Sequence, residues 1–461
     1  MRKTKYIDQL KKISSIYSYA GSLALVFLLL KASLASAQVL PERPWRQAIL
    51  DSAKELMTRE STPGLWLVVV DSGELIISET MGLASVIGPT PLTRETVARL
   101  PGSNELAINL AILKLAEMKR LELDAQIGSY VEVPQFLGKV TARQLITNRA
   151  GLRANHFDTP LWKDEDLALA VKSWDKSIFI AEPGETRSHS HYSIALAGYL
   201  VELVVGKPFP DAMRELVWEP MGVSAGISRI SDALVLPMAQ GHELKEDKME
   251  VVKPLGLGFN GWPGDAAFLS LETMEGLATA LAQPANSGVD NGGIAKPQWQ
   301  SGWGWAGVSF RLIVDVERGF SALIADNGGG ASGELATMIE RQVLEQAAPE
   351  APQPIDWQEP TKEAMALLPG VYKNEGTIEI VLRDDKLVVL SSSGSDPAQI
   401  MQGPDMQFGL FIDDGAGSRR NVMTFTIESQ RDGKIRHLRF GSRVWLRTVS
   451  LDNENNKKNR K

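Results

Sequence analysis

Residues 98–115 read ARLPGSNELAINLAILKL, and this stretch decides how the surrounding chain folds. The eight residues after Glu105, Leu106 to Leu113, carry no charge and a single polar side chain, that of Asn109. A helix that is apolar on nearly all sides has to be buried. We therefore predict a central buried helix whose N-terminus opens at Ser103 and Glu105.

The start of this helix suits chemistry as well as capping. Backbone N–H groups at a helix N-terminus are unpaired and create a positive local field, which favours a nucleophile, a bound anion or a carboxylate. Ser103 would equally serve as an ordinary N-cap, because its hydroxyl can accept a hydrogen bond from the first turn. The sequence around the helix has to decide between these interpretations.

Composition limits the function classes. The chain has 461 residues, 44% of them hydrophobic and 23% charged, which are globular values that allow two or three domains. The formal net charge of −7 argues against a nucleic-acid partner. The chain contains no cysteine, which excludes disulfides, thiolate metal sites, cysteine nucleophiles and a lipid-anchored cysteine.

Residues 1–37 have the pattern of a secretory signal peptide. Several basic residues precede the apolar run from Tyr19 to Leu30, and Ala35-Ser36-Ala37 offers a cleavage site before Gln38. The alternative is a retained membrane anchor, but the uncharged run is shorter than the ~20 residues that a span needs. We expect a periplasmic or secreted protein with no stable membrane span after cleavage.

The spacing of apolar residues predicts that residues 38–347 form one domain. Two hairpins and several helices predict an antiparallel sheet covered by helices, with a helical insertion. The predicted hairpins join 65–70 to 74–80 and 310–314 to 320–325, and the predicted helices besides the central one are 45–57, 141–146, 194–205, 271–281 and 336–347.

A second domain follows a linker. Residues 348–360 hold four prolines in thirteen positions and predict the linker. Residues 361–450 contain about six short strand patterns separated by aspartate and glycine turns, which predict a small all-β barrel or sandwich. The tail, residues 451–461, is polar and is expected to be disordered.

The framework of residues 38–347 resembles the β-lactamase-related family of serine hydrolases and penicillin-binding proteins. The resemblance implies an α+β fold of the serine β-lactamase/DD-peptidase type: an antiparallel sheet flanked by helices with a helical insertion. The C-terminal unit is similar to the small barrel often appended to such hydrolases. The segments that carry the resemblance are 93–97, 110–124, 140–152, 183–186, 195–206 and 219–222.

The three catalytic motifs of that family are replaced in this chain. The nucleophile and base of Ser-x-x-Lys fall on Gly102 and Glu105, and glycine offers no hydroxyl to acylate. Tyr-x-Asn falls on residues 189–191, which read His-Ser-His. The Lys-Thr-Gly or His-x-Gly motif falls near Ser301, in the sequence SGWG of residues 301–304. These departures predict that hydrolysis by the family's route is lost or severely impaired.

Two altered active sites remain as alternatives. In an extended segment, His189 and His191 would point to the same side, and the resemblance aims both at Glu105. A histidine–carboxylate proton relay formed by His189 and Glu105 could act on Ser103 as nucleophile. The same two histidines and Glu105 could instead bind a divalent metal ion as a cofactor, and the sequence points to no other cofactor. In the third interpretation, which involves no catalysis, both histidines form hydrogen bonds with backbone groups in a polar loop.

A further Ser-x-x-Lys motif occurs at residues 173–176. It lies ahead of the second family motif in the sequence and is a weak signal of a catalytic site.

Other residues are candidate ligand contacts. His191, Asn148 and Arg149 fall in or beside the cleft that the resemblance implies, and Arg149 could bind a carboxylate or form a structural ion pair. Trp303, with Trp262 and Trp305, could stack on a sugar, a peptide or an aromatic ligand, or pack in the core. We expect a small-molecule or peptide ligand.

Three functions follow from these observations. The first is a non-hydrolytic member of the family that retains a binding cleft. The second is an active hydrolase of the esterase, peptidase or amidase class that uses Ser103 or a metal near His189, His191 and Glu105. The third is a structural or assembly protein of the cell envelope in which the C-terminal β unit is the working part.

Overall fold

A computed structural model describes most of the chain after residue 41, with gaps. The described residues are 42–154, 166–222, 229–246, 248–252, 266–283, 298–305, 307–345, 355–374, 377–391, 398–413, 419–431 and 434–448. The chain divides into two compact units, residues 1–43 and 44–461, and the second contains every element named below. The predicted signal peptide, residues 1–37, and the predicted tail, residues 451–461, lie outside the described residues.

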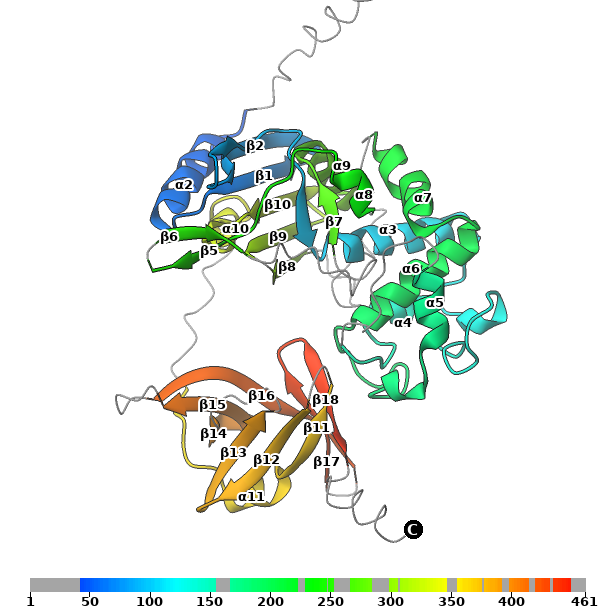
Figure 1. Ribbon diagram of the computed structural model, residues 1–461, viewed down its shortest axis with the longest axis vertical. Helices are drawn as coiled ribbons and strands as arrows, with labels where there is room; N and C mark the ends of the chain where they lie inside the picture. The colour runs from blue at the N-terminus through cyan, green and yellow to red at the C-terminus, as the bar shows by residue number, and fades with distance from the viewer. Residues whose placement is uncertain are drawn as a thin grey trace, which may run out of the picture. The chain divides into compact units, whose positions relative to one another are not determined.

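A six-stranded antiparallel sheet forms the centre of the N-terminal part (Figure 1). Its strand order is β3-β2-β1-β10-β9-β8, and both predicted hairpins are confirmed as β1–β2 and β9–β10. All eight residues of β1 are buried, which explains why this strand is a continuous apolar run. The strands are β1 Gly64–Asp71, β2 Glu74–Ser85, β3 Thr90–Pro91, β8 Gln298–Trp305, β9 Val308–Asp315 and β10 Phe320–Asp326.

Helices cover both faces of this sheet. Alternate side chains of a strand point to opposite faces. Leu65, Leu67 and Val69 of β1 accordingly pack in one core with α2 (Arg46–Arg59) and α10 (Ala331–Gln342). The neighbouring residues Trp66, Val68 and Val70 pack in the larger core with α3 (Ser103–Glu117), α6 (His191–Val205) and α9 (Leu271–Leu281). The structure thus confirms the predicted sheet with helices on its faces.

The predicted central helix is α3, which is buried over most of its length. Eleven of its fifteen residues are buried, including the first three. Its N-cap is Gly102 in the left-handed conformation (φ 77°), with no side-chain cap hydrogen bond, and Ser103 is the first helical residue. The prediction of Ser103 as N-cap was therefore wrong. Glycine tolerates this backbone conformation without steric cost, which suits it to the turn that starts the helix.

The helical insertion lies beside α3 and α6. It contains α4 (Ala142–Ile146), α5 (Asp166–Ser173), α7 (Phe209–Met213) and a π-helical turn, η3 (Arg214–Trp218). Helix α6 ends at Gly206, which adopts the left-handed conformation with φ 76°, as the sequence predicts for a glycine stop. The smaller elements are the strand pairs β4 (Ala98–Pro101) with β7 (Ala266–Leu269) and β5 (His242–Lys245) with β6 (Lys248–Val251), and the short helix α8 (Ile230–Ala233).

The C-terminal β unit is a closed barrel of eight strands, which decides between the predicted barrel and the sandwich. Two of its strands, β11 and β14, were not predicted, nor was the short helix α11 (Lys362–Leu367) before the barrel. Large apolar side chains such as Tyr372, Phe408 and Leu438 fill the interior. The strands are β11 Gly370–Lys373, β12 Thr377–Arg383, β13 Lys386–Ser391, β14 Ala398–Gln402, β15 Gln407–Asp413, β16 Arg419–Arg431, β17 Lys434–Phe440 and β18 Arg443–Thr448.

One helix boundary differs clearly from its prediction. Helix α10 begins at Ala331, five residues before the predicted start, and ends at Gln342 instead of residue 347. The carboxylate of Asp326 accepts hydrogen bonds from the backbone N–H groups of Gly328 (3.1 Å) and Ser332 (3.0 Å) and so holds the glycine-rich turn against the start of the helix. This capping contact was not predicted from the sequence.

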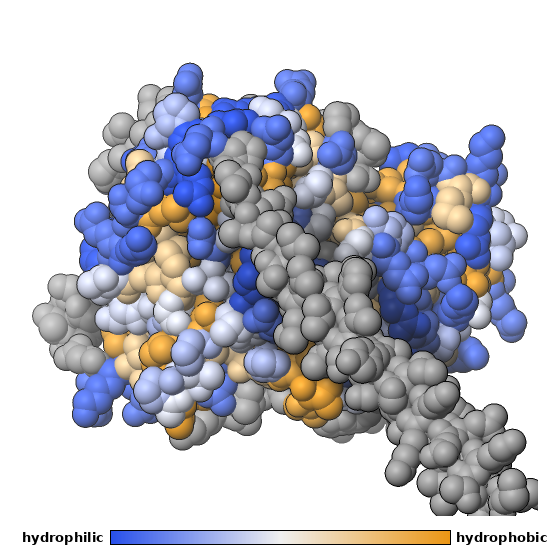
Figure 2. Space-filling model, turned by 90° about the horizontal axis from the view of Figure 1, so that it is seen from above, coloured by the Kyte–Doolittle hydropathy of each residue, from blue (hydrophilic) through white to orange (hydrophobic). Residues whose placement is uncertain are grey.

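The surface has the mixed character of a folded protein. Figure 2 shows hydrophilic residues over much of one face, with small apolar patches between them. Among the described helices, none by itself combines the length and apolar character of a membrane span. Helix α6 meets that test only together with the segment Phe209–Met221, which lies at 78° to it, and α6 is largely buried in the protein core.

Candidate functional site

The start of α3 places Ser103 and Glu105 on different sides of the helix. Ser103 is fully buried, and its Oγ donates to the carbonyl of Leu100 (2.6 Å) and accepts from the N–H of Ala267 (2.9 Å). The hydroxyl therefore links strand β4 to strand β7. The side chain of the predicted nucleophile therefore has no exposed surface, and its hydroxyl has a structural role between the two strands.

Glu105 is the buried charged group of the site. Its side chain is 4% exposed, Oε1 accepts from Nδ2 of Asn148 at 2.9 Å, and Oε2 lies 3.6 Å from Nε2 of His189. That second distance is longer than a hydrogen bond, and Oε2 has no hydrogen-bond partner among the residues that the structure describes. The structure therefore brings together three of the residues that the sequence singled out.

The charge of Glu105 is stabilised in spite of its burial. Burial by itself raises the pKa of the Glu105 carboxyl, because the charged form loses its hydration. The polar contact and charge of His189, the hydrogen bond from Asn148 and the charge of Arg187 act in the opposite direction and prevail. The pKa of Glu105 consequently lies below its ordinary value, and the group is a carboxylate at neutral pH.

Asn148 connects this carboxylate to the segment that carries His189. It follows α4 in the left-handed conformation (φ 55°), which asparagine adopts more readily than most residues. While Nδ2 donates to Glu105, Oδ1 accepts from the N–H of Ser190 (3.2 Å), and the Asn148 carbonyl accepts from the N–H of Ser188 (2.8 Å). Asn148 was predicted as a ligand contact, and the structure gives its side chain a bridging role.

His189 and His191 are neighbours, as their spacing predicted. Their rings lie 5.0 Å apart at 88°, and the side chain of His189 is 19% exposed. Nδ1 of His191 contacts the carbonyl oxygen of Ala154 at 2.7 Å. Within the described parts of the chain, no three His, Asp or Glu side chains are arranged to hold a metal ion. The hypothesis of a metal site at Glu105, His189 and His191 therefore finds no support in the geometry.

The remaining predicted residues lie at several places. Ser301 stands on the edge strand β8 opposite Leu312, and Trp303 stands on the same strand opposite Phe310. The side chains of β8 at these positions, and residue 262, are outside the described residues, so their ligand contacts stay predictions. Arg149 is half-buried, and its backbone bonds to Gln144 and Gly184.

The weak Ser-x-x-Lys signal has a structural explanation. Ser173 ends α5, and its Oγ donates to the carbonyl of Ala170 at 2.7 Å. Lys176 begins a separate short 3₁₀ turn. The two residues therefore do not share one helical face, as a nucleophile and base one turn apart would require.

One group of contacts at the site was missed by sequence reasoning. The backbone N–H of His189 donates to the carbonyl of Ser442 at 3.0 Å, and Ser442 belongs to the turn between β17 and β18 of the barrel. The N–H of Val444, also in the barrel, donates to Oγ of Ser188 at 3.0 Å. In each of these hydrogen bonds, the two residues are more than two hundred positions apart in the sequence. No local sequence pattern could therefore predict the contacts.

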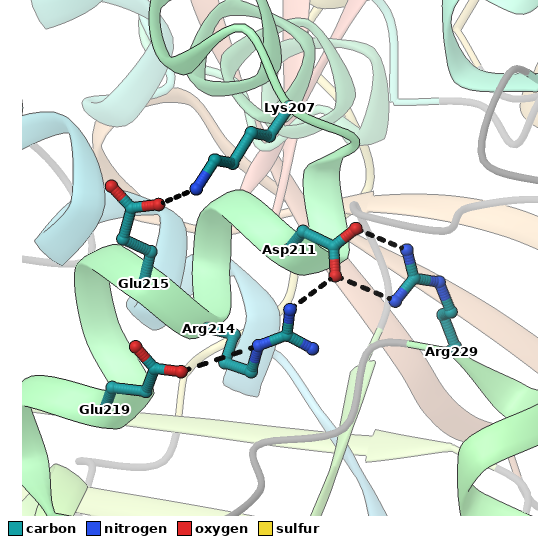
Figure 3. Close-up of polar contacts among 6 residues, drawn as sticks. All are labelled: Lys207, Asp211, Arg214, Glu215, Glu219 and Arg229. Carbon is teal, nitrogen blue, oxygen red and sulfur yellow. Dashed lines mark hydrogen bonds and ion pairs between the residues drawn. The ribbon is translucent and has the colours of Figure 1, made fainter.

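A charged depression elsewhere on the surface is a weaker candidate. It has a volume of about 320 Å³ and lies over α7 and the π-helical turn. Its charges pair with one another (Figure 3): Lys207 with Glu215, Arg214 with Asp211 and Glu219, and Arg229 with Asp211. Such exposed ion pairs are usually surface structure, so this depression is not assigned a catalytic role.

Comparison with known proteins places these observations in a family. A family model described as Beta-lactamase matches residues 51–344. The human serine beta-lactamase-like protein LACTB, mitochondrial, is 28% identical over 152 residues, which cover 30% of this chain and 27% of that protein. Esterase EstB of Burkholderia gladioli is 26% identical over 240 residues, which cover 46% of this chain and 60% of that protein. The matches span about a quarter to three fifths of these relatives.

Solved structures extend the similarity in fold beyond the N-terminal part. The crystal structure of SurE superposes with a TM-score of 0.67 at 17% sequence identity. That match covers 87% of this chain and 99% of SurE. At this identity the comparison supports a shared fold, and it carries no information about substrate.

Proposed function

The chain belongs to the beta-lactamase family of serine hydrolases, and we propose that it is a member that binds a ligand without hydrolysing it. The observation that carries this proposal is Glu105. A buried carboxylate, held by Asn148 and facing His189, occupies the position of the family's lysine. Gly102, at the position of the family's nucleophile, has no side chain to acylate.

The chemistry of the site supports binding. Acyl transfer by the family's route needs an exposed hydroxyl and a base that takes its proton. Here the hydroxyl of Ser103, one residue after the position of the family's nucleophile, is bonded to backbone groups of β4 and β7. His189, with 19% of its side chain exposed, is the member of the Glu105 pair that a ligand can reach. We therefore assign ligand contact to the imidazole of His189, backed by the negative charge of Glu105.

The pairing of His189 with Glu105 also favours a second candidate function. A carboxylate that orients an imidazole is the arrangement by which histidine acts as a general base. In that function His189 would take a proton from water, and the water would attack an ester or amide carbonyl. Ser103 has no part in this alternative, which keeps the family's reaction class with a different apparatus.

Covalent labelling and a hydrolysis assay distinguish ligand binding without hydrolysis from hydrolysis with His189 as general base. We expect neither a fluorophosphonate probe nor benzylpenicillin to change the intact mass of the protein, because Gly102 has no hydroxyl and the hydroxyl of Ser103 is buried and bonded to backbone groups. An adduct mapped to Ser103, and absent from Ser103→Ala, would overturn the proposal. Steady hydrolysis of p-nitrophenyl acetate that is lost in His189→Gln and kept in His191→Gln would establish the second candidate. Absence of both the adduct and this hydrolysis is the result that the proposal expects.

The location of the protein belongs to the same proposal. The signal-peptide pattern of residues 1–37 supports export, and we propose that the mature chain starts at Gln38 in the periplasm or outside the cell. The ligand would then be a small molecule or peptide of that compartment. Sequencing the N-terminus of the protein recovered from a periplasmic extract tests this, and a retained Met1 would contradict it.

A further inference from the structure

We propose that the C-terminal barrel positions the two histidines of the candidate site, and that the site is incomplete without it. The histidine segment is defined as residues 185–190, which lead from the helical insertion into α6. This inference rests on the site proposed above. It assigns the barrel a part in that site instead of a separate binding function.

The backbone of the histidine segment is held from two sides. The N–H groups of Ser188 and Ser190 donate to Asn148, at 2.8 Å and 3.2 Å. The N–H of His189, between them, donates to the barrel carbonyl of Ser442 at 3.0 Å. Successive N–H groups of an extended chain point to opposite sides, so this alternation requires one partner on each side. The barrel supplies the side that Asn148 cannot reach.

A charged clamp holds the middle of the segment. Arg439 of β17 forms two hydrogen bonds to Glu428 of β16, at 2.6 Å and 2.7 Å, and also donates to the carbonyl of Arg187 at 2.8 Å. Oγ1 of Thr186 donates to Oε1 of the same glutamate at 2.7 Å. Bonds of this charge-assisted kind are shorter and stronger than neutral ones. The clamp therefore fixes residues 186 and 187 to the barrel.

A third contact reaches the other histidine. Asn374 of the barrel is buried, and its Oδ1 accepts from the N–H of Ala154 at 2.6 Å while its Nδ2 donates to the carbonyl of Val444 at 2.7 Å. The carbonyl oxygen of Ala154 is the partner of Nδ1 of His191. Asn374 thus holds the residue against which the His191 ring is oriented.

Glu105 and His189 do not fix their relative positions by a hydrogen bond between them. Oε2 of Glu105 and Nε2 of His189 are 3.6 Å apart, which is too long for a hydrogen bond to lock the ring. The position of the imidazole relative to the carboxylate is therefore set by the backbone that carries it. Since the barrel provides an anchor of that backbone at His189 itself, a loosened barrel contact changes the pair.

Chemical modification of individual histidines tests this positioning role in the full-length protein. We expect Arg439→Ala to raise the rate at which diethyl pyrocarbonate modifies His189 by about tenfold, the effect of losing one charged hydrogen bond. His242 is the internal reference, because it is buried and held by Asn327 and Val86. Lys434→Ala, an exposed position on the same strand β17, is the matched control and leaves both rates unchanged.

A conservative pair guards against simple unfolding of the barrel. Thr186→Val removes the hydroxyl that binds Glu428, and Thr186→Ser keeps it. We expect faster modification of His189 in the valine variant and the wild-type rate in the serine variant. Equal His189 rates in wild type, Arg439→Ala and Thr186→Val would overturn the proposal.

The titration of Glu105 provides a readout that general destabilisation does not mimic. Contact with His189 lowers the pKa of Glu105 against the effect of burial. We therefore expect carbon-13 NMR of the Glu105 carboxyl to show a higher pKa in Thr186→Val than in Thr186→Ser. An unchanged pKa would contradict the positioning role. Neither readout uses a ligand or a serine-directed probe, so failure here is distinct from failure of the proposed function.

Discussion

The amide nitrogen of Asn148 lies 2.9 Å from Oε1 of Glu105, and the same side chain accepts the N–H of Ser190 through its oxygen. The side chain of Asn148 thus stabilises the buried carboxylate through a hydrogen bond and also anchors the histidine segment. Both partners are buried, so neither finds water when the asparagine is removed.

Replacement of this asparagine should therefore be costly. We expect Asn148→Ala to lower the free energy of unfolding by about 2–4 kcal/mol, because a buried carboxylate oxygen and a buried N–H both lose their partner. Urea denaturation measures the loss. Asn421→Ala, in the barrel strand β16 and far from the site in sequence, serves as the comparison, and a change in Asn148→Ala no larger than in this control would contradict the expectation.

Restoring the family's nucleophile should not restore its chemistry. Gly102 adopts φ 77°, where a side chain costs roughly 1–2 kcal/mol. We expect Gly102→Ser to be destabilised by about that amount and to remain unlabelled by a fluorophosphonate probe. Gly333→Ser in α10 is the control, since a Cβ there meets its nearest neighbour at 3.7 Å and its backbone is helical. Labelling of Gly102→Ser would show that the altered surroundings still activate a hydroxyl.

The family's lysine should be poorly tolerated at position 105. In Glu105→Lys, a buried ammonium would face Nδ2 of Asn148 and Nε2 of His189 in place of the carboxylate that they contact. An uncompensated buried charge costs about 3–5 kcal/mol, so thermal unfolding should shift strongly downwards. Glu105→Gln keeps an oxygen for Asn148 and is expected to lose less. Equal melting temperatures for the two variants would show that the charge at this position is unimportant.

Stability should fall as the solution is acidified below about pH 6.5, the ordinary pKa of histidine. Burial lowers the pKa of His437, against the opposing hydrogen bond to Ile180, and burial likewise lowers the pKa of His242. A histidine whose folded pKa is depressed takes up its proton in the unfolded state first. Stability is thus complete above the unfolded pKa and declines as the pH drops towards the folded one.

The measurement for this dependence is urea unfolding between pH 7.5 and about pH 5, above the range in which carboxyl groups titrate in the unfolded chain. His437 is surrounded by Arg436, Glu185 and Glu428, and its Nε2 contacts the carbonyl of Ile180 at 2.8 Å. We expect His437→Gln to reduce the slope of stability against pH, with His242 accounting for the remainder. A slope identical to wild type would rule out this assignment.

Much of the fold was accessible from the sequence because its signals are local. The apolar run of α3, the glycine stop at Gly206 and the turns of the two sheet hairpins all act within a few residues. The short strands β11 and β14 lack such a signal, since their pairing in the barrel, and not their composition, defines them.

The candidate site was accessible in part for the same reason. The framework put Glu105 and His189 in one place, and the structure has them in contact. The direction of the Ser103 hydroxyl depends on Ala267, and the anchor of His189 depends on Ser442. Such contacts are properties of the assembled tertiary structure, and a single sequence contains no pattern that specifies them.

Closure of the C-terminal barrel restricts how another protein can engage it. Each of its eight strands is hydrogen-bonded to two neighbours, β11 and β18 included. A closed sheet has no free edge onto which a foreign strand could be added, and it is protected from edge-to-edge aggregation for the same reason. A partner of the barrel must therefore recognise side chains on its outer wall or its connecting loops.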